Sequence, residues 1–208
     1  MMYHHIRSGE GHRKVAKDLS CEPSVFKNHL NYLQNNGYTT TTFLDILNGV
    51  EAKNPVILTF DDGTISQWIA FEELKSRKMK GVFFVVCSYI GNRGYLNLGQ
   101  LKEIASSGME IGSHSIGHPN LNGVSQSRLE SEILWSKVIL EKFVHTRVVS
   151  FCYPYGKYDH RVLDTLNGSE YFFARTTDEG IKDIGIKDFK IKILYIHNST
   201  RDLSKVMR

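Results

Sequence analysis

The segment Thr59-Phe60-Asp61-Asp62-Gly63 directly follows the apolar stretch Val56 to Leu58. This pattern predicts a buried strand that ends in two adjacent carboxylates. Successive side chains on extended backbone point to opposite faces, so one of the two carboxylates can bind a metal while the other accepts a proton. Gly63 permits a sharp turn that keeps both carboxylates at the mouth of a site. The alternative for this segment alone is a solvated turn after a strand.

Length and composition predict one globular domain covering residues 1–208. A content of 41% hydrophobic and 23% charged residues is typical of a folded domain and excludes a disordered or fibrous chain. No apolar run reaches the roughly 20 residues that cross a bilayer. The first residues lack the basic head and apolar core of a signal peptide. We therefore expect a cytoplasmic location for the chain as it stands, or an extracytoplasmic one if a leader was removed.

The cysteines and the net charge exclude two further classes. Cys21, Cys87 and Cys152 are odd in number and far apart, which matches neither a disulfide framework nor a short-spaced zinc site. The net charge is +4, but the basic residues are spread along the chain rather than clustered. We expect reduced, structural cysteines and no nucleic-acid partner, and the sequence does not indicate an oligomeric state.

Apolar segments of strand length alternate with segments of helical period, as in a parallel α/β sheet or barrel. The predicted strands are Val56–Phe60, Gly81–Val86, Met109–Gly112, Val148–Tyr153, Tyr171–Arg175 and Ile191–His197. The predicted helices are Pro23–Asn36, Ser66–Lys78, Leu98–Ser107, Ser125–Val144 and Asp159–Asn167. The segment Ser8–Asp18 contains glycines and basic residues and predicts a loop, either mobile or simply solvated.

A second polar motif, Glu110-Ile111-Gly112-Ser113-His114-Ser115-Ile116-Gly117-His118-Pro119, begins with a short strand. Within one helical turn, the spacing of His114 and His118 would place both imidazoles on one side, where they reach a single ion at roughly 2.0–2.1 Å. The alternative is two ordinary loop histidines. The strand before His114 and the proline after His118 favour the carboxyl end of a strand, where α/β barrels gather their active sites.

Two further motifs end predicted strands. In Phe151-Cys152-Tyr153-Pro154-Tyr155-Gly156, the proline fixes a turn that could aim the N–H of Tyr155 at a developing oxyanion. In Leu194-Tyr195-Ile196-His197, a histidine follows the last strand, where it could act as a general acid. The alternatives are a tight turn and a structural histidine.

Taken in order, TFDDG, HSIGH, YPYG and LYIH resemble the motifs of the polysaccharide deacetylases, the family four carbohydrate esterases. The resemblance covers almost the whole chain and is closest to members that act on bacterial surface polysaccharides. It implies a distorted, incomplete (β/α) barrel and a metal-dependent hydrolase. Such an enzyme removes N-acetyl groups from the amino sugars of a glycan and releases acetate. The expected partner is therefore an N-acetylated glycan, with no integral membrane segment.

The resemblance also implies roles for individual residues. It implies one divalent ion, most simply zinc, bound by Asp62, His114 and His118. Asp61 would be the catalytic base and His197 the general acid, with His4 or His5 as substitutes near the same mouth. Tyr155 would supply a backbone N–H to the oxyanion and Pro154 would hold its turn, while Leu194 and Tyr153 would contact substrate.

The sequence departs from the family pattern beside the proposed base. Many members carry an arginine at the position of Cys152, which pairs with the base, and a later Asp-x-x-Asp-Trp segment. Here the corresponding region reads Arg175-Thr176-Thr177-Asp178, so both partners are expected to be missing and the base to be oriented differently. The alternatives left open are a hydrolase of a small cyclic amide or formamide, and a non-catalytic carbohydrate-binding protein.

Overall fold

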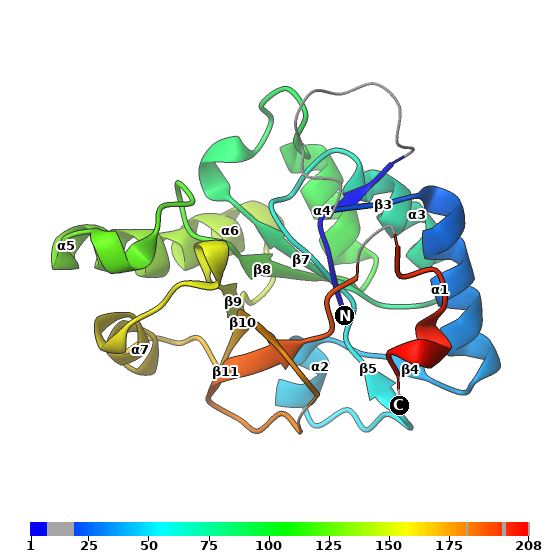
Figure 1. Ribbon diagram of the computed structural model, residues 1–208. Helices are drawn as coiled ribbons and strands as arrows, with labels where there is room; N and C mark the ends of the chain where they lie inside the picture. Colours follow the sequence, from blue (N-terminus) through cyan, green and yellow to red (C-terminus); the bar gives the residue numbers. More distant parts are fainter. Residues whose placement is uncertain (8–18, 182, 197–198, 208) are drawn as a thin grey trace.

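The computed structural model describes residues 1–7, 19–181, 183–196 and 199–207. Its centre is a seven-stranded sheet in the order β1-β6-β7-β8-β9-β10-β11, with every pairing parallel (Figure 1). The strands are β1 (Met2–Tyr3), β6 (Thr59–Phe60), β7 (Val82–Val85), β8 (Glu110–Ser113), β9 (Ser150–Cys152), β10 (Phe173–Glu179) and β11 (Asp188–Ile193). A parallel bridge between Met2 and Tyr195 brings the chain after β11 against β1. The sheet thus nearly closes, which confirms the predicted incomplete barrel.

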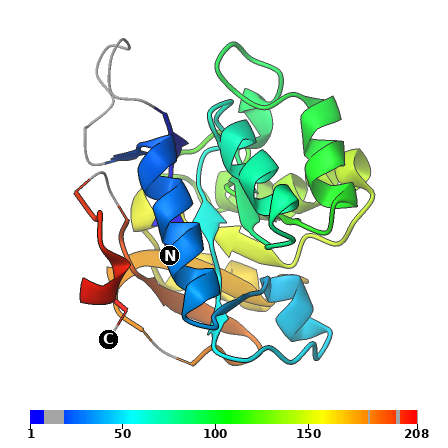
Figure 2. The same ribbon diagram turned by 90° about the vertical axis from the view of Figure 1, so that its right-hand side faces the viewer.

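Helices cover the outside of this barrel, except the short helix Phe43–Leu47, whose Phe43 packs into the smaller cluster inside it. The helices are α1 (Pro23–Asn35), α2 (Phe43–Leu47), α3 (Gln67–Ser76), α4 (Leu98–Ser106), α5 (Gln126–Glu130), α6 (Ser136–Val144) and α7 (His160–Asn167). Two small parallel sheets pair β2 (His5–Ile6) with β3 (Ser20–Cys21) and β4 (Thr39–Thr40) with β5 (Pro55–Val56). Figure 2 shows α1 with the C-terminal segment beside it, where His29 hydrogen-bonds the carbonyl of Thr200.

Successive side chains along each strand point to opposite faces of the sheet, and this alternation divides the core into two layers. On β7, Phe83 and Val85 belong to the larger apolar cluster, which includes the buried faces of the helices, while Val82 and Phe84 belong to a smaller one. The smaller cluster combines apolar residues of α2, of four barrel strands and of the position just before β9: Phe43, Val82, Phe84, Val149, Cys152, Phe173 and Ile191. A strand buried on both faces reads as a continuous apolar run, as β7 does.

Two sequence predictions change in detail. The predicted strand Val56–Phe60 is divided, because Val56 ends β5 in a small sheet and Thr59 begins β6 in the barrel. The predicted helix Ser125–Val144 contains a π-helical turn at Ser131–Trp135 between α5 and α6. The predicted loop Ser8–Asp18 lies outside the described residues. Within the described ranges, no helix is long and apolar enough to cross a membrane.

One buried carboxylate ties α2 to the barrel. Glu110, the first residue of β8, is 2% exposed. Its side chain accepts hydrogen bonds from Ser150 Oγ on β9 at 2.5 Å and from the N–H of Leu44 on α2 at 2.8 Å. Burial raises the pKa of Glu110 to about 7, although these hydrogen bonds oppose the rise.

Glu110 is expected to make stability depend on pH. Its folded-state pKa of about 7 exceeds the ordinary value of 4.5, so its contribution is fully present below pH 4.5 and is lost as pH rises through 7. The loss is on the order of 3 kcal/mol. Urea unfolding of wild type and Glu110→Gln across this range should give a difference that changes with pH. Parallel stability curves would contradict the assignment.

Candidate metal centre and catalytic site

In the turn after β6, the carboxylates of Asp61 and Asp62 contact different partners. Asp61 is 2% exposed, whereas the side chain of Asp62 is 25% exposed. Asp62 has a φ of 77° and Gly63 a φ of 70°, so the chain turns through two successive left-handed residues. A Cβ at position 63 would also lie 3.4 Å from Val85, which makes glycine the residue that fits this turn.

Asp62 and two histidines converge on one point. Asp62 Oδ1 lies 3.4 Å from His114 Nε2 and 3.6 Å from His118 Nε2. The two Nε2 atoms are 3.1 Å apart. A tetrahedral zinc ion with bonds of roughly 2.0–2.1 Å separates its ligands by about 3.4 Å. These three atoms therefore have the spacing that one such ion requires.

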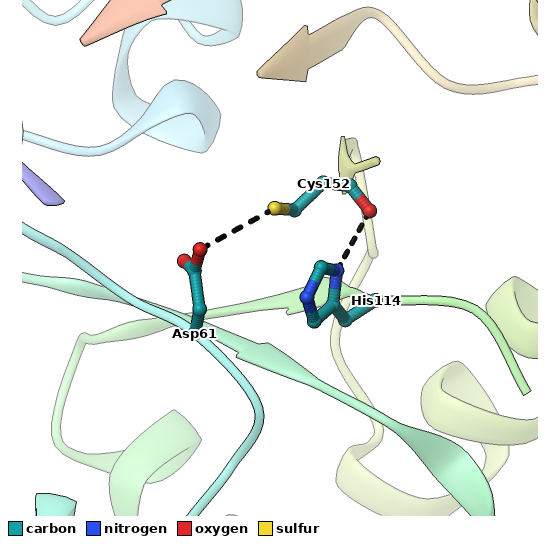
Figure 3. Close-up of side chains that lie close together, drawn as sticks. All are labelled: Asp61, His114 and Cys152. Carbon is teal, nitrogen blue, oxygen red and sulfur yellow. Dashed lines mark hydrogen bonds between the residues drawn. The ribbon is translucent and has the colours of Figure 1, made fainter. Parts of the chain in front are cut away.

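The protonation of His114 also suits a cation. Its Nδ1 lies 2.8 Å from the carbonyl oxygen of Cys152, which can only accept a hydrogen bond, so Nδ1 carries the proton (Figure 3). The Nε2 lone pair then faces Asp62 and His118. Burial lowers the pKa of His114, but its surroundings, which include the carboxylates of Asp62 and Asp61, raise it overall, so this position favours positive charge. Two imidazole nitrogens and one carboxylate oxygen are a donor set that zinc takes at catalytic sites.

The loop between the two histidines is not helical, which corrects the expectation of one helical turn. Ser115 has a φ of 68° and His118 a φ of 57°, both left-handed. Two irregular bends therefore bring the imidazoles together. Burial, followed by the influence of His114, lowers the pKa of His118 to about 4, so its ring is neutral at neutral pH.

The expected absence of an arginine beside Asp61 is wrong. Arg175 on β10 donates from Nη2 to Asp61 Oδ2, and the same nitrogen lies 2.7 Å from Cys152 Sγ. Cys152 on β9 and Arg175 on β10 are paired in the register of these two strands. The arginine beside Asp61 therefore comes from β10, whereas the family motif places it on β9, at the position of Cys152. Arg175 is 1% exposed, and β6 and β10 are not neighbours in the sheet, so this ion pair crosses the barrel interior.

The sequence contains a signal for the burial of Arg175. It lies two residues after Phe173 on the predicted strand Tyr171–Arg175, and Phe173 belongs to the smaller core cluster. Alternation therefore predicts that the Arg175 side chain shares the face of Phe173 and lies among the same apolar residues. A buried arginine requires a carboxylate partner, and Asp61 is that partner.

The second oxygen of Asp61 is left open. Among the described residues, Oδ1 is buried and has no hydrogen-bond partner. His4 is near the other oxygen, with Nε2 3.7 Å from Oδ2. A buried carboxylate oxygen without a donor is costly, which marks Oδ1 as an atom that a substrate or a water molecule would approach.

A second group of ligand-type atoms combines Asp61, His114 and Cys152. Figure 3 shows Cys152 between the other two, with Sγ toward Asp61 and its carbonyl toward His114. The guanidinium of Arg175 already contacts Asp61 and Cys152 and would repel a cation there. Burial also raises the pKa of Cys152 and keeps the thiol protonated. We therefore assign the cation site to the other group.

The other residues predicted for the site lie in different places: Tyr155 at the surface, Tyr153 in the core and Leu194 at a cavity. Tyr155 follows Pro154 with a φ of 58°, is 62% exposed, and packs its ring 4.7 Å from that of His118. Tyr153 is 1% exposed and donates its hydroxyl to the carbonyl of Phe189, so it is a core residue rather than a substrate contact. Leu194 is partly buried and lines a cavity of about 520 Å³, whose lining does not include Asp62, His114 or His118. His197 lies outside the described residues.

Comparison with known proteins places this geometry in a family. The model of the polysaccharide deacetylase family matches residues 48–173. YxkH of Bacillus subtilis (strain 168), named for the polysaccharide deacetylases, is 33% identical over 186 residues, which cover 86% of this chain and 64% of YxkH.

Solved structures agree with the sequence match. BC0361, a polysaccharide deacetylase from Bacillus cereus, has a TM-score of 0.86 and 29% identity, covering 96% of this chain and 65% of that one. The Streptococcus pyogenes deacetylase PplD, solved in complex with acetate, has a TM-score of 0.86 and 26% identity, covering 100% and 96%. The chain thus spans about two thirds of the length of YxkH and BC0361. It belongs to the polysaccharide deacetylase family.

Proposed function

We propose that this chain hydrolyses N-acetyl groups on the amino sugars of a polysaccharide or oligosaccharide and releases acetate. The observation that carries the proposal is the candidate cation site of Asp62, His114 and His118 beside the adjacent residue Asp61, whose Oδ1 is buried and has no partner among the described residues. Family membership supports deacetylation as the reaction class. The acetate in the PplD structure is consistent with acetate as the product.

The proposed cofactor is one divalent ion, with zinc as the first candidate. Asp62, His114 and His118 would hold it, and their spacing suits tetrahedral coordination with one position left open. When bound, the ion would polarise the amide carbonyl and make water more acidic.

The proposed reaction breaks the amide C–N bond, leaves the water oxygen on the acetyl carbon and gives an amine and acetate. Asp61 is the proposed base, because Oδ1 is free to accept the proton of water while Arg175 holds Oδ2. The N–H of Tyr155, in the turn held by Pro154, is the proposed donor to the carbonyl oxygen. His197 is the proposed donor of the proton to the departing amine, on the basis of its motif.

Aromatic side chains near the cation site support a sugar as substrate. Tyr89 and Tyr95 pack with ring centroids 4.6 Å apart, and Tyr95 forms a bridge with Thr64 in the turn after β6. The ring of Tyr155 is exposed beside His118. The C–H faces of pyranose rings are apolar and pack on such rings, while phenol hydroxyls can bond sugar hydroxyls. Leu194 is the proposed contact for the acetyl methyl group.

Metal analysis tests the cation site. Wild type should bind one equivalent of Zn²⁺, and His118→Ala should weaken binding by about 100-fold or more, since loss of even an outer partner costs 10–100-fold. His160→Ala is the matched control, because His160 is exposed on α7. Dialysis followed by elemental analysis measures the bound zinc. A full equivalent with unchanged affinity in His118→Ala would exclude the proposed ligand set.

Acetate release tests the reaction and the separate roles of the two aspartates. With N-acetylglucosamine oligomers, Asp61→Asn should keep zinc and lose about 10²- to 10⁴-fold in kcat. Asp62→Asn should instead lose zinc affinity, and Asp164→Asn, an exposed carboxylate on α7, should match wild type. Equal zinc loss in both site variants would contradict the division of roles. Wild type that turns over small cyclic amides but releases no acetate would contradict the proposed function.

A further inference from the structure

The histidine loop, residues 115–118, has all its backbone N–H groups bound by side chains. Ser113 Oγ accepts the N–H of Ser115 at 3.2 Å, and Ser115 Oγ accepts the N–H of His118 at 2.9 Å. The two N–H groups between them share one acceptor atom, Glu132 Oε2, at 2.9 Å from residue 116 and 2.8 Å from residue 117. A single carboxylate from another part of the chain therefore holds the middle of this loop.

Glu132 is placed for this contact by an irregular part of its helix. It is the second residue of the π-helical turn Ser131–Trp135, and its side chain is 7% exposed. Such turns are rare and occur frequently at functional sites. The other oxygen, Oε1, lies 3.5 Å from Arg128 Nε, and it would lie 3.4 Å from a Cβ added to Gly117. Loop backbone and carboxylate are therefore in close contact.

The opposite edge of the loop is held as well. The carbonyls of Ser115 and Ile116 accept hydrogen bonds from the N–H groups of Cys87 and Ser88, at 3.2 and 2.9 Å. Left-handed non-glycine residues such as Ser115 and His118 cost of order 1–3 kcal/mol each unless their surroundings hold them. Glu132 supplies two charge-assisted bonds in the middle of this strained segment, immediately before His118.

We infer that Glu132 is a positioning residue for the metal centre: it fixes the histidine loop so that His118 Nε2 points at Asp62 and His114. This inference rests on the proposed metal site and extends it beyond the three ligands. Among the described residues, the carboxylate of Glu132 bonds the N–H groups of residues 116 and 117 and pairs with Arg128, and none of these groups is a proposed ligand atom. Its removal should therefore weaken metal binding without abolishing the fold.

Titration with Zn²⁺ alone, in competition with a chromogenic chelator, tests this inference. Glu132→Ala should lower zinc affinity by about 10–100-fold, as expected for a lost outer partner. Glu132→Met keeps the side-chain length without the acceptor and should lose as much. Glu132→Gln keeps an amide oxygen for both N–H groups and should stay within about threefold of wild type. Glu130→Ala, an exposed glutamate on α5, is the matched control.

The thermal midpoint of each metal-free variant separates positioning from stability. If Glu132→Ala and Glu132→Met melt at lower temperature but bind zinc as wild type does, the carboxylate is structural only and the inference is wrong. A low zinc affinity in Glu132→Gln would also overturn the inference, because a hydrogen-bond acceptor at this position would then not be enough to hold the loop. Wild type that binds no zinc would instead contradict the proposed function.

Discussion

The ion pair between Asp61 and Arg175 is the contact on which the rest of the site depends. Both side chains are buried inside the barrel, where an unpaired charge would be costly. Neither side chain can therefore move away without leaving the charge of the other buried and unpaired. The pair links β6 with β10, two strands separated by three others in the sheet. It thereby fixes the tip of β6 and occupies one oxygen of Asp61, while the other oxygen is buried and has no partner among the described residues.

Local strain is the second constraint on the site. Asp62, Ser115, His118 and Tyr155 are four of the eight non-glycine residues with positive φ in the described ranges. Each lies in a turn that follows a barrel strand, where an ordinary extended or helical conformation would carry the side chain elsewhere. Side-chain hydrogen bonds from Ser113 and Glu132, together with the turn at Pro154, offset this cost. The geometry of the proposed metal ligands therefore depends on residues outside the proposed ligand set.

The sequence was sufficient for the barrel and for the convergence of Asp62, His114 and His118, because the apolar strands and the polar residues at their carboxyl ends are local patterns. It also contained the reason why Tyr153 is buried: Phe151 and Tyr153 share the strand face opposite to Cys152, and that face packs against the helices. The π-helical turn and the contact of Glu132 with the histidine loop have no such local signal, since they depend on how a distant helix packs. The helical spacing of His114 and His118 was a misleading signal, because an irregular loop produces the same convergence.

The central claim is that one ion sits between Asp62, His114 and His118 while Asp61 remains outside its coordination. Anomalous X-ray diffraction at the zinc absorption edge, on crystals of the zinc-loaded protein, tests this directly. The account predicts one strong peak within roughly 2.0–2.2 Å of Asp62 Oδ1 and both Nε2 atoms, with Asp61 still bound to Arg175. A peak coordinated by Asp61 and Cys152, or no peak at the three ligands, would contradict it.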